Sequence, residues 1–284
     1  MGRITARWPV TKVTVGREPS RRPDLLAVEE PLEIRIAGNA FTITMRTPGN
    51  DVELAAGFLV SEGVITRADQ LISAIHCGGP GTGGAAGEPN TYNVLDLQLG
   101  FGAAVPSPDA ARNFYMTSAC GVCGKTSIDT VETKSSFDIT DDRVAVDSAT
   151  LIELPESLRS GQRAFDSTGG LHAAALFDAT TGEQLVLRED VGRHNAVDKV
   201  IGWAVNNDRV PLRGTVLQVS GRASFELVQK AVMAGIPILA AVSAPSSLAA
   251  ELADRAGLTL IGFLRGQSMN VYTHPDRVRV TADR

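Results

Sequence analysis

The amino-acid sequence predicts an α/β protein in which a smaller α+β domain precedes the main α/β domain. From residue 171 onward, apolar strand patterns and helix patterns alternate regularly, as they do in α/β domains. The strand patterns are almost continuously apolar, which is expected when helices cover both faces of a parallel sheet with right-handed crossovers. The segment before residue 100 instead combines hairpin and helix patterns. We therefore expect an N-terminal domain over residues 1–145 and an α/β domain over residues 146–284.

Short-range patterns predict how the N-terminal domain begins. Residues 32–36 and 41–45 alternate apolar and polar side chains on either side of a short turn, which indicates a β-hairpin. Asn50 or Asp51 can cap the helix that follows, and Gly63 can end it.

The rest of this domain is expected to contain two strands and two loops. Strands are predicted at residues 71–76 and 92–99. The glycine-rich residues 78–87 between them offer too few side chains to pack, so they predict a flexible loop. Residues 100–142 show no sustained periodicity, and we expect a second flexible loop there.

The α/β domain is expected to begin with a pair of strands and to continue with alternating helices and strands. The predicted elements are strands at residues 171–177 and 184–189, a helix at 195–205, a strand at 215–220, a helix at 223–234, a strand at 238–243, a helix at 246–256 and a strand at 259–264.

Composition limits the partners that the chain can have. The formal net charge of −5 and the pI near 5.5 argue against nucleic-acid binding. The sequence holds no apolar run of 18 residues and its first residues lack the apolar core of a secretory signal. Its 3 cysteines are too few for a disulfide-stapled secreted domain. We expect a cytoplasmic protein that binds neither nucleic acid nor membranes.

A pair of cysteines in a glycine-rich loop is the most informative motif. Cys120 and Cys123 stand in the sequence Cys-Gly-Val-Cys-Gly-Lys. Sulfur relay needs a thiolate that can attack a donor persulfide and then move to a second site. Lys125 and a short helix predicted after Gly124 would both favour the thiolate. The motif therefore favours a catalytic persulfide carrier, and by itself it leaves disulfide redox chemistry and zinc binding open.

Other interpretations of the cysteine pair fit the sequence less well. A structural zinc site needs four ligands, and neither Cys77 nor any of the 4 histidines has the required spacing. A thioredoxin-like motif should follow a strand directly and open a long helix, whereas residues 113–119 are irregular. We predict no metal site, and we expect Cys77 to be a buried core residue.

Three loops at predicted strand ends carry arginine, and ligands bind at such ends in α/β sheets. Together they predict a pocket for a multiply anionic ligand such as a dinucleotide pyrophosphate. The residues assigned to this pocket are Arg193, His194, Ser220, Gly221, Arg222, Phe263, Leu264, Arg265, Gly266, Gln267 and Ser268.

A purely structural interpretation of the first loop remains open. In that interpretation Asn195 caps a helix, Asp198 and Lys199 form a solvated face, and Arg193 pairs with Asp190. His172 lies within an apolar strand pattern and is expected in the core.

These motifs together resemble the FdhD family of formate dehydrogenase accessory sulfurtransferases. The segments that carry the resemblance are 119–125, 190–202, 220–235, 245–253 and 257–272. It implies a cytidine-deaminase-like α/β core, a homodimer, and transfer of sulfur from a cysteine desulfurase to the bis(molybdopterin guanine dinucleotide) molybdenum cofactor of formate dehydrogenase. Cys120 matches the persulfide-bearing cysteine, Cys123 matches its partner, and residues 263–268 match the cofactor-binding stretch, where a guanine nucleotide could also bind. The zinc signature of deaminases is absent from the sequence, so the resemblance carries no deaminase chemistry.

Two other functions compete with the sulfurtransferase hypothesis. In a cofactor chaperone, binding of the cofactor by the arginine pocket would be the whole function, and replacing both cysteines would leave formate dehydrogenase activation intact. A disulfide oxidoreductase would turn over protein disulfides without any desulfurase.

Overall fold

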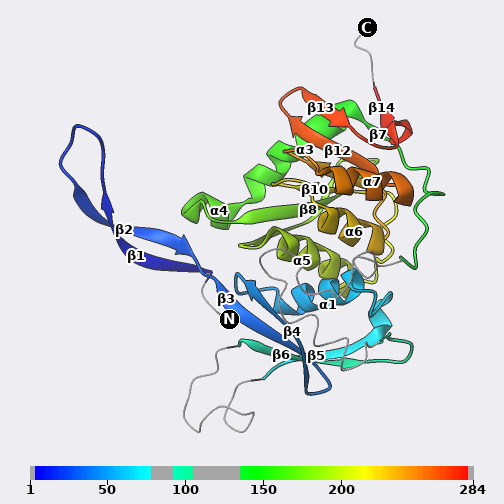
Figure 1. The fold of residues 1–284 in the computed structure, drawn as a ribbon, viewed down its shortest axis with the longest axis horizontal. Helices are drawn as coiled ribbons and strands as arrows, with labels where there is room; N and C mark the ends of the chain where they lie inside the picture. The colour runs from blue at the N-terminus through cyan, green and yellow to red at the C-terminus, as the bar shows by residue number, and fades with distance from the viewer. Residues whose placement is uncertain (1–3, 78–91, 105–134, 281–284) are drawn as a thin grey trace.

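The computed structural model describes residues 4–77, 92–104 and 135–280, and within these the chain forms two layered halves and a projecting arm (Figure 1). The helices are α1 (Asp51–Ser61), α3 (Ser148–Gly161), α4 (Arg163–Thr168), α5 (Arg193–Asn206), α6 (Phe225–Met233) and α7 (Ser247–Ala256), with short 3-10 helices at Ala68–Gln70 and Pro275–Arg277.

The strands of the N-terminal half are β1 (Thr5–Lys12), β2 (Ser20–Ala27), β3 (Glu30–Ile36), β4 (Asn39–Arg46), β5 (Leu71–Cys77) and β6 (Val94–Leu99). Those of the C-terminal half are β7 (Val146–Asp147), β8 (His172–Asp178), β9 (Gln184–Asp190), β10 (Thr215–Val219), β11 (Ile238–Ala241), β12 (Thr259–Arg265), β13 (Ser268–Val271) and β14 (Val278–Arg279).

The C-terminal half is built on a sheet in the order β13-β12-β11-β10-β8-β9. Alternate side chains of its strands enter two separate hydrophobic clusters, one with α3 on one face and one with α5, α6 and α7 on the other. The mixed α/β class predicted from the sequence is therefore confirmed. The cytidine-deaminase-like arrangement stays a prediction.

The expectation of a parallel sheet is only partly correct. Within the described sheet, β10, β11 and β12 run parallel, whereas β8, β9 and β13 are antiparallel to their neighbours. Apolar runs report that both faces of a strand are covered, and they do not report the strand's direction. The link between β8 and β9 spans residues 179–183 and is too short for a crossover, so these strands form a hairpin.

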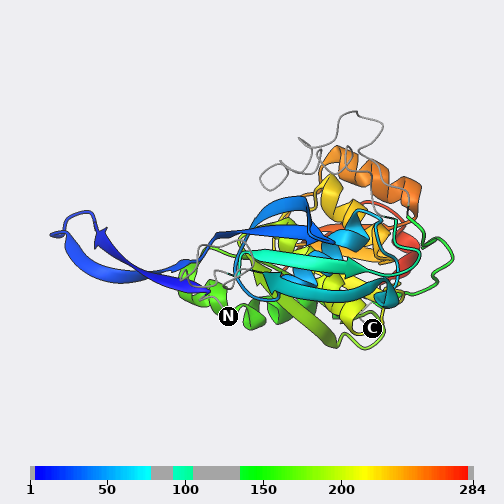
Figure 2. The same cartoon turned by 90° about the horizontal axis from the view of Figure 1, so that it is seen from below.

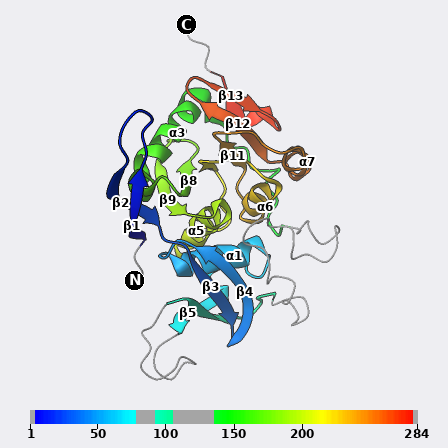
Figure 3. The same cartoon turned by 60° about the vertical axis from the view of Figure 1, so that its left-hand side comes forward.

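The N-terminal half contains a sheet in the order β4-β3-β6-β5, covered by α1. Figure 3 shows α1 lying between this sheet and α5 of the C-terminal half. The predicted hairpin and the helix after Asn50 are thus confirmed as β3, β4 and α1. One hydrophobic cluster continues from this sheet through α1 and α5 into the six-stranded sheet, so the two halves share a core.

Two glycines allow α1 and α5 to pack backbone against backbone. A Cβ atom at Gly57 would overlap the carbonyl oxygen of Asp198, and one at Gly202 would overlap the carbonyl oxygen of Glu53. Glu53 also pairs with Arg188 of β9, with an oxygen 2.7 Å from a guanidinium nitrogen. These contacts fix the N-terminal half on the C-terminal half.

Strands β1 and β2 form an antiparallel hairpin over residues 5–27 that extends away from the body and that we call the arm (Figure 2). No local sequence pattern predicts these two strands, nor α3, α4, β13 and β14. In the described part of the chain, no helix is long and apolar enough to cross a membrane.

Candidate functional site

The carboxyl ends of β9, β10, β11 and β12 meet at one edge of the six-stranded sheet. The register places His172, at the start of β8, opposite Asp190, at the end of β9, and Ser220 follows β10 beside them. Phe263 lies at the same level, because its amide donates to the carbonyl of Ser243 after β11. We call this the strand-end edge. It comprises His172 and residues 190–194, 220–222 and 263–268.

The three predicted arginine loops therefore share an edge, although they are spread along it. From β9 to β12 the sheet takes four strand steps, which is roughly 19 Å at about 4.8 Å per step. That span suits an elongated ligand with charges along its length better than a compact anion.

The turn between β9 and α5 is held by a buried aspartate. The Asp190 carboxylate accepts hydrogen bonds from the amides of Thr47 (3.1 Å) and Gly192 (2.8 Å) and from the side chain of Asn195 (3.2 Å). It also pairs with Lys199 Nζ at 2.7 Å, and the two side chains are 0% and 2% exposed. Burial raises the pKa of Asp190, and the cation of Lys199 opposes that rise.

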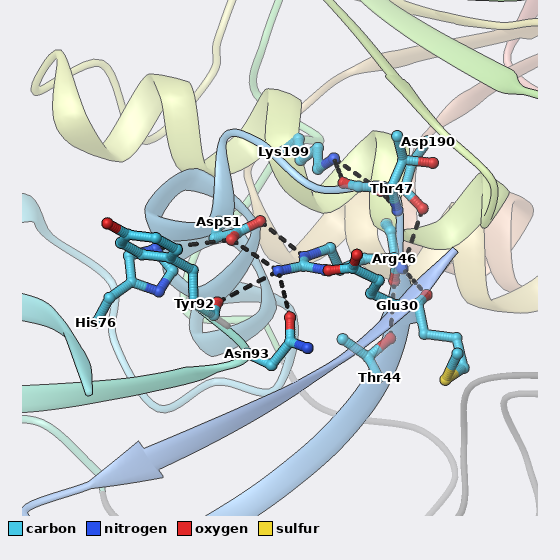
Figure 4. Close-up of polar contacts among 12 residues, drawn as sticks. Glu30, Thr44, Arg46, Thr47, Asp51, His76, Tyr92, Asn93, Asp190 and Lys199 are labelled. Carbon is cyan, nitrogen blue, oxygen red and sulfur yellow. Dashed lines mark hydrogen bonds and ion pairs between the residues drawn. The ribbon is translucent and has the colours of Figure 1, made fainter. Parts of the chain in front are cut away.

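The end of β4 contacts this turn from the N-terminal half, as Figure 4 shows. Asn195 donates to the carbonyl of Met45 at 2.7 Å, and the amide of Val191 donates to the Thr47 hydroxyl at 3.1 Å. Lys199 donates to the carbonyl of Thr47 at 2.9 Å. The position of the Arg193 loop thus depends on a strand that lies about 150 residues earlier in the chain.

A second buried ion pair supports the end of β4. Arg46 is 1% exposed and makes two hydrogen bonds to Asp51, at 3.0 and 3.1 Å (Figure 4). It also donates to the carbonyl of Tyr92 and the side chain of Asn93. This network ties β4 to α1 and to the segment before β6.

The structural interpretation of the α5 residues was wrong for Asp198 and Lys199. Both side chains are buried. Lys199 pairs with Asp190, while Asp198 accepts from Lys230 at 2.8 Å and from the Ser61 hydroxyl at 2.7 Å. Asp190 does not take Arg193 as its partner. The Arg193 side chain is therefore not the cation that neutralises Asp190.

At this edge, the guanidinium of Arg193 has a nitrogen that donates to none of the described residues. Its Nε is buried and has no hydrogen-bond partner within the part of the chain that the structure describes. Such a group normally finds an acceptor, and a ligand phosphate would supply one. Arg222 and Arg265 are exposed at the same edge.

His194 faces the start of α6. Its Nε2 lies 2.8 Å from a carboxylate oxygen of Glu226 and 3.3 Å from the hydroxyl of Ser224. Both contacts use the same ring nitrogen, whereas a serine-histidine-acid triad needs the acid on the other nitrogen. These three side chains are therefore not arranged as a hydrolase triad.

The carboxyl end of β12 has an unusual backbone. Phe263 has a φ of 51°, in the left-handed region that costs non-glycine residues energy. A register shift between Gly262 and Arg265 accompanies it, and the Arg265 guanidinium lies 5.5 Å from the centre of the Phe263 ring. Strain of this kind collects at ligand sites.

A cavity of about 450 Å³ opens at the strand-end edge on the side of α3 and α4. It is lined by apolar residues and by a few polar ones, which are Arg159, Gln162, His172 and Ser220. The expectation that His172 lies in the core was therefore incorrect, because its position opposite Asp190 in the register of β8 and β9 places it at the cavity. Burial, followed by the charges of Arg193 and His194, lowers the pKa of His172, so the ring is neutral near pH 7.

The two cysteines predicted to be catalytic, Cys120 and Cys123, lie outside the described residues. The third, Cys77, ends β5 as a free thiol and is half-buried, so the expectation that it lies buried in the core was wrong.

Comparison with known proteins gives concordant results. The model of the FdhD/NarQ family matches residues 27–279. The sulfur carrier protein FdhD of Mycolicibacterium paratuberculosis is 59% identical over 275 residues, which cover 97% of this chain and 99% of that protein. The protein of the same name from Sulfolobus acidocaldarius is 44% identical over 271 residues, covering 95% and 96%.

A solved structure described as a formate dehydrogenase accessory protein, from Desulfotalea psychrophila, has a TM-score of 0.73. The match covers 98% of this chain and 100% of that one at 22% identity, so it supports the fold alone. The arm lies almost entirely before the residues that the family model matches.

Proposed function

Because the chain belongs to the FdhD/NarQ family, we propose that it is a sulfur carrier that serves the maturation of a formate dehydrogenase. The proposal rests on the sequence identity of 59% and 44%, over nearly the whole chain, between this protein and relatives named as sulfur carrier proteins. The same resemblance supports a homodimer and a cytidine-deaminase-like core as parts of the proposal.

In the proposed mechanism Cys120 carries the sulfur. Its thiolate attacks the outer sulfur of a persulfide on a cysteine desulfurase. A new sulfur-sulfur bond forms on Cys120, the old one breaks, and the desulfurase cysteine leaves as a thiolate. Cys123 assists the second transfer: its thiolate attacks the inner sulfur, on Cys120, a disulfide forms between the two cysteines, and the outer sulfur leaves as hydrosulfide. The hydrosulfide passes to the bis(molybdopterin guanine dinucleotide) molybdenum cofactor, and a thiol reductant then restores both cysteines. That cofactor is the substrate of the protein.

The strand-end edge is the proposed docking site for this substrate. Arg193, with its buried Nε, and the exposed Arg222 and Arg265 offer cations to the two pyrophosphates. The span of the edge suits an elongated molecule, and His194 with residues 220–221 and 263–268 would complete the contacts.

The sulfur step is tested by incubating the protein with a cysteine desulfurase and cysteine and then measuring its intact mass. We expect an added sulfur atom that a reductant removes, and we expect Cys120→Ala to abolish it. Cys77→Ala is the matched control and should load normally. An unmodified wild-type mass would contradict the proposal.

The same variants separate the proposal from its alternatives. A cofactor chaperone would activate formate dehydrogenase without either cysteine of the pair. A disulfide oxidoreductase would reduce or oxidise a protein disulfide with no desulfurase present. We expect the Cys120→Ala/Cys123→Ala variant to lose activation and the wild-type protein to show no such turnover.

The docking site is tested by titrating a guanine nucleotide into variants of the edge. We expect Arg193→Gln and Arg222→Gln each to weaken binding about tenfold, the loss typical of a charge-assisted contact. Arg213→Gln is the control, because Arg213 precedes β10 at the opposite edge and pairs with Asp141. Equal affinities in all variants would remove the edge as the docking site.

A further inference from the structure

The arm, residues 5–27, is a two-stranded hairpin without a core of its own. Strands β1 and β2 pair along their full length, from Thr5 with Ala27 to Lys12 with Ser20. Most of their side chains are exposed, and Figures 1 and 2 show the hairpin extending well beyond the body. A two-stranded hairpin is only marginally stable by itself in water. Contact of one of its faces with another surface would therefore stabilise the arm.

One face of the arm combines exposed apolar side chains with basic ones. In an antiparallel pair, residues directly opposite share a face, so Trp8, Val10 and Leu26 lie on the same side. Trp8 is 60% exposed and Leu26 is 43% exposed. Arg22, opposite Val10, and Lys12 lie on this face too, together with Asp24, opposite Trp8. We call it the Trp8 face.

The edges of the arm are unsuited to pairing with another strand. Pro9 stands directly opposite Pro23. Since proline has no amide hydrogen, it fits where that hydrogen would point away from the partner strand. Both outer edges therefore lack a donor at the same level, a feature that blocks edge-to-edge addition. A partner must be bound through the side chains of a face.

Charge selects the kind of partner. The arm carries five basic and two acidic side chains, although the whole chain has a formal net charge of −5. The basic charge of the arm is thus set apart from an acidic body, and it complements an acidic surface. An exposed tryptophan beside arginine is also typical of residues that dominate protein interfaces.

The position of the arm determines where a bound partner would lie. Ala27, at its base, packs next to Gly170, which lines the cavity together with His172. Figure 1 shows the arm leaving the body beside α4, on the side where β8 begins. A protein held by the arm would therefore face the strand-end edge.

We propose that the Trp8 face docks a partner protein whose apolar groove is bordered by acidic side chains, and that this partner is the formate dehydrogenase apoprotein. The choice of partner rests on the proposed function, because the protein that takes the sulfurated cofactor must approach the edge where it is held. The arm holds that protein over the edge.

The proposal is tested by measuring the affinity of the full chain for purified formate dehydrogenase apoprotein. We expect Trp8→Ser and Arg22→Glu each to weaken binding about tenfold or more, and raised salt to weaken the wild-type complex. Arg21→Glu makes the same change of charge on the opposite face, and we expect a smaller loss. A photoreactive residue at Val15, which is fully exposed at the arm's tip, should crosslink to the apoprotein.

Several results would overturn this proposal. Unchanged affinity in Trp8→Ser and Arg22→Glu would refute it, provided that both variants melt at the wild-type temperature. A change in oligomeric state, in desulfurase affinity or in nucleic-acid binding, with dehydrogenase binding intact, would assign the arm to another partner. Persulfide loading of the same variants is measured in parallel. Normal loading together with unchanged affinity for the dehydrogenase would reject docking by the Trp8 face and leave the proposed sulfur carrier function intact.

Discussion

Replacing Lys199 by methionine should destabilise the protein strongly, because it leaves a buried carboxylate without its cation. Asp190 is 0% exposed and lies 2.7 Å from Lys199. Removing one partner of such a pair costs about 3–5 kcal/mol, mainly because the remaining charge stays out of water. Lys199→Met also removes the hydrogen bond to the carbonyl of Thr47. We expect the free energy of unfolding to fall by about 4 kcal/mol.

Urea denaturation followed by circular dichroism measures this loss, and a double variant tests its cause. With Asp190→Asn added, position 190 is neutral. Its side-chain oxygen can still accept from the amide of Gly192, whereas an NH2 group replaces the oxygen that accepts from the amide of Thr47, which limits the recovery. We expect the double variant to recover about 1–2 kcal/mol.

The pH dependence gives an independent check. Without Lys199, the pKa of Asp190 should rise further above its unfolded value. A carboxyl whose pKa is raised by folding favours the folded state at low pH, and that advantage is lost as the pH rises. The single variant should therefore be closer to wild type at pH 5 than at pH 8. A loss below about 1 kcal/mol with no dependence on pH would refute the role given to this pair.

Three further predictions concern the packing of the halves and the strand-end edge. Gly202→Ala should lower the free energy of unfolding by about 3 kcal/mol or more, because its Cβ would overlap the Glu53 backbone; wild-type stability would contradict the close helix packing. Because the pKa of His172 is lowered in the fold, wild-type stability should decline as the pH falls below about 6.5. His172→Gln should show a weaker decline in parallel denaturation curves, and equal slopes would exclude this effect. Phe263→Gly should be more stable than Phe263→Ala by about 1 kcal/mol, because glycine tolerates the φ of 51°; calorimetry giving the reverse order would argue against strain there.

Much of the fold could be predicted because local patterns report burial. Apart from β13 and β14, the strands and helices from residue 171 onward could be predicted from their apolar periodicity, and α1 from its capping residues. Strand direction was not, since β8 and β9 are covered on both faces like the parallel strands. The arm shows no apolar periodicity because neither of its faces packs on the core. Helix α3 was missed because Pro155 interrupts its helix pattern.

The site was predicted only as far as single loops allow. Arginines at strand ends could be recognised one loop at a time, and the sheet order then determined that they share an edge. His172 and Asp190 lie opposite each other because of the register between β8 and β9. The anchoring of Asn195 by Met45 joins residues 150 positions apart. No local pattern contains such contacts.

The central claim is that sulfur travels through Cys120 to a formate dehydrogenase, and following labelled sulfur tests it most directly. Desulfurase, radiolabelled cysteine, this protein with unsulfurated cofactor bound, and dehydrogenase apoprotein would be combined, and the label in the reisolated dehydrogenase counted. We predict that wild-type protein and Cys77→Ala transfer label and restore formate oxidation, whereas Cys120→Ala does neither. Equal transfer by Cys120→Ala would contradict the account.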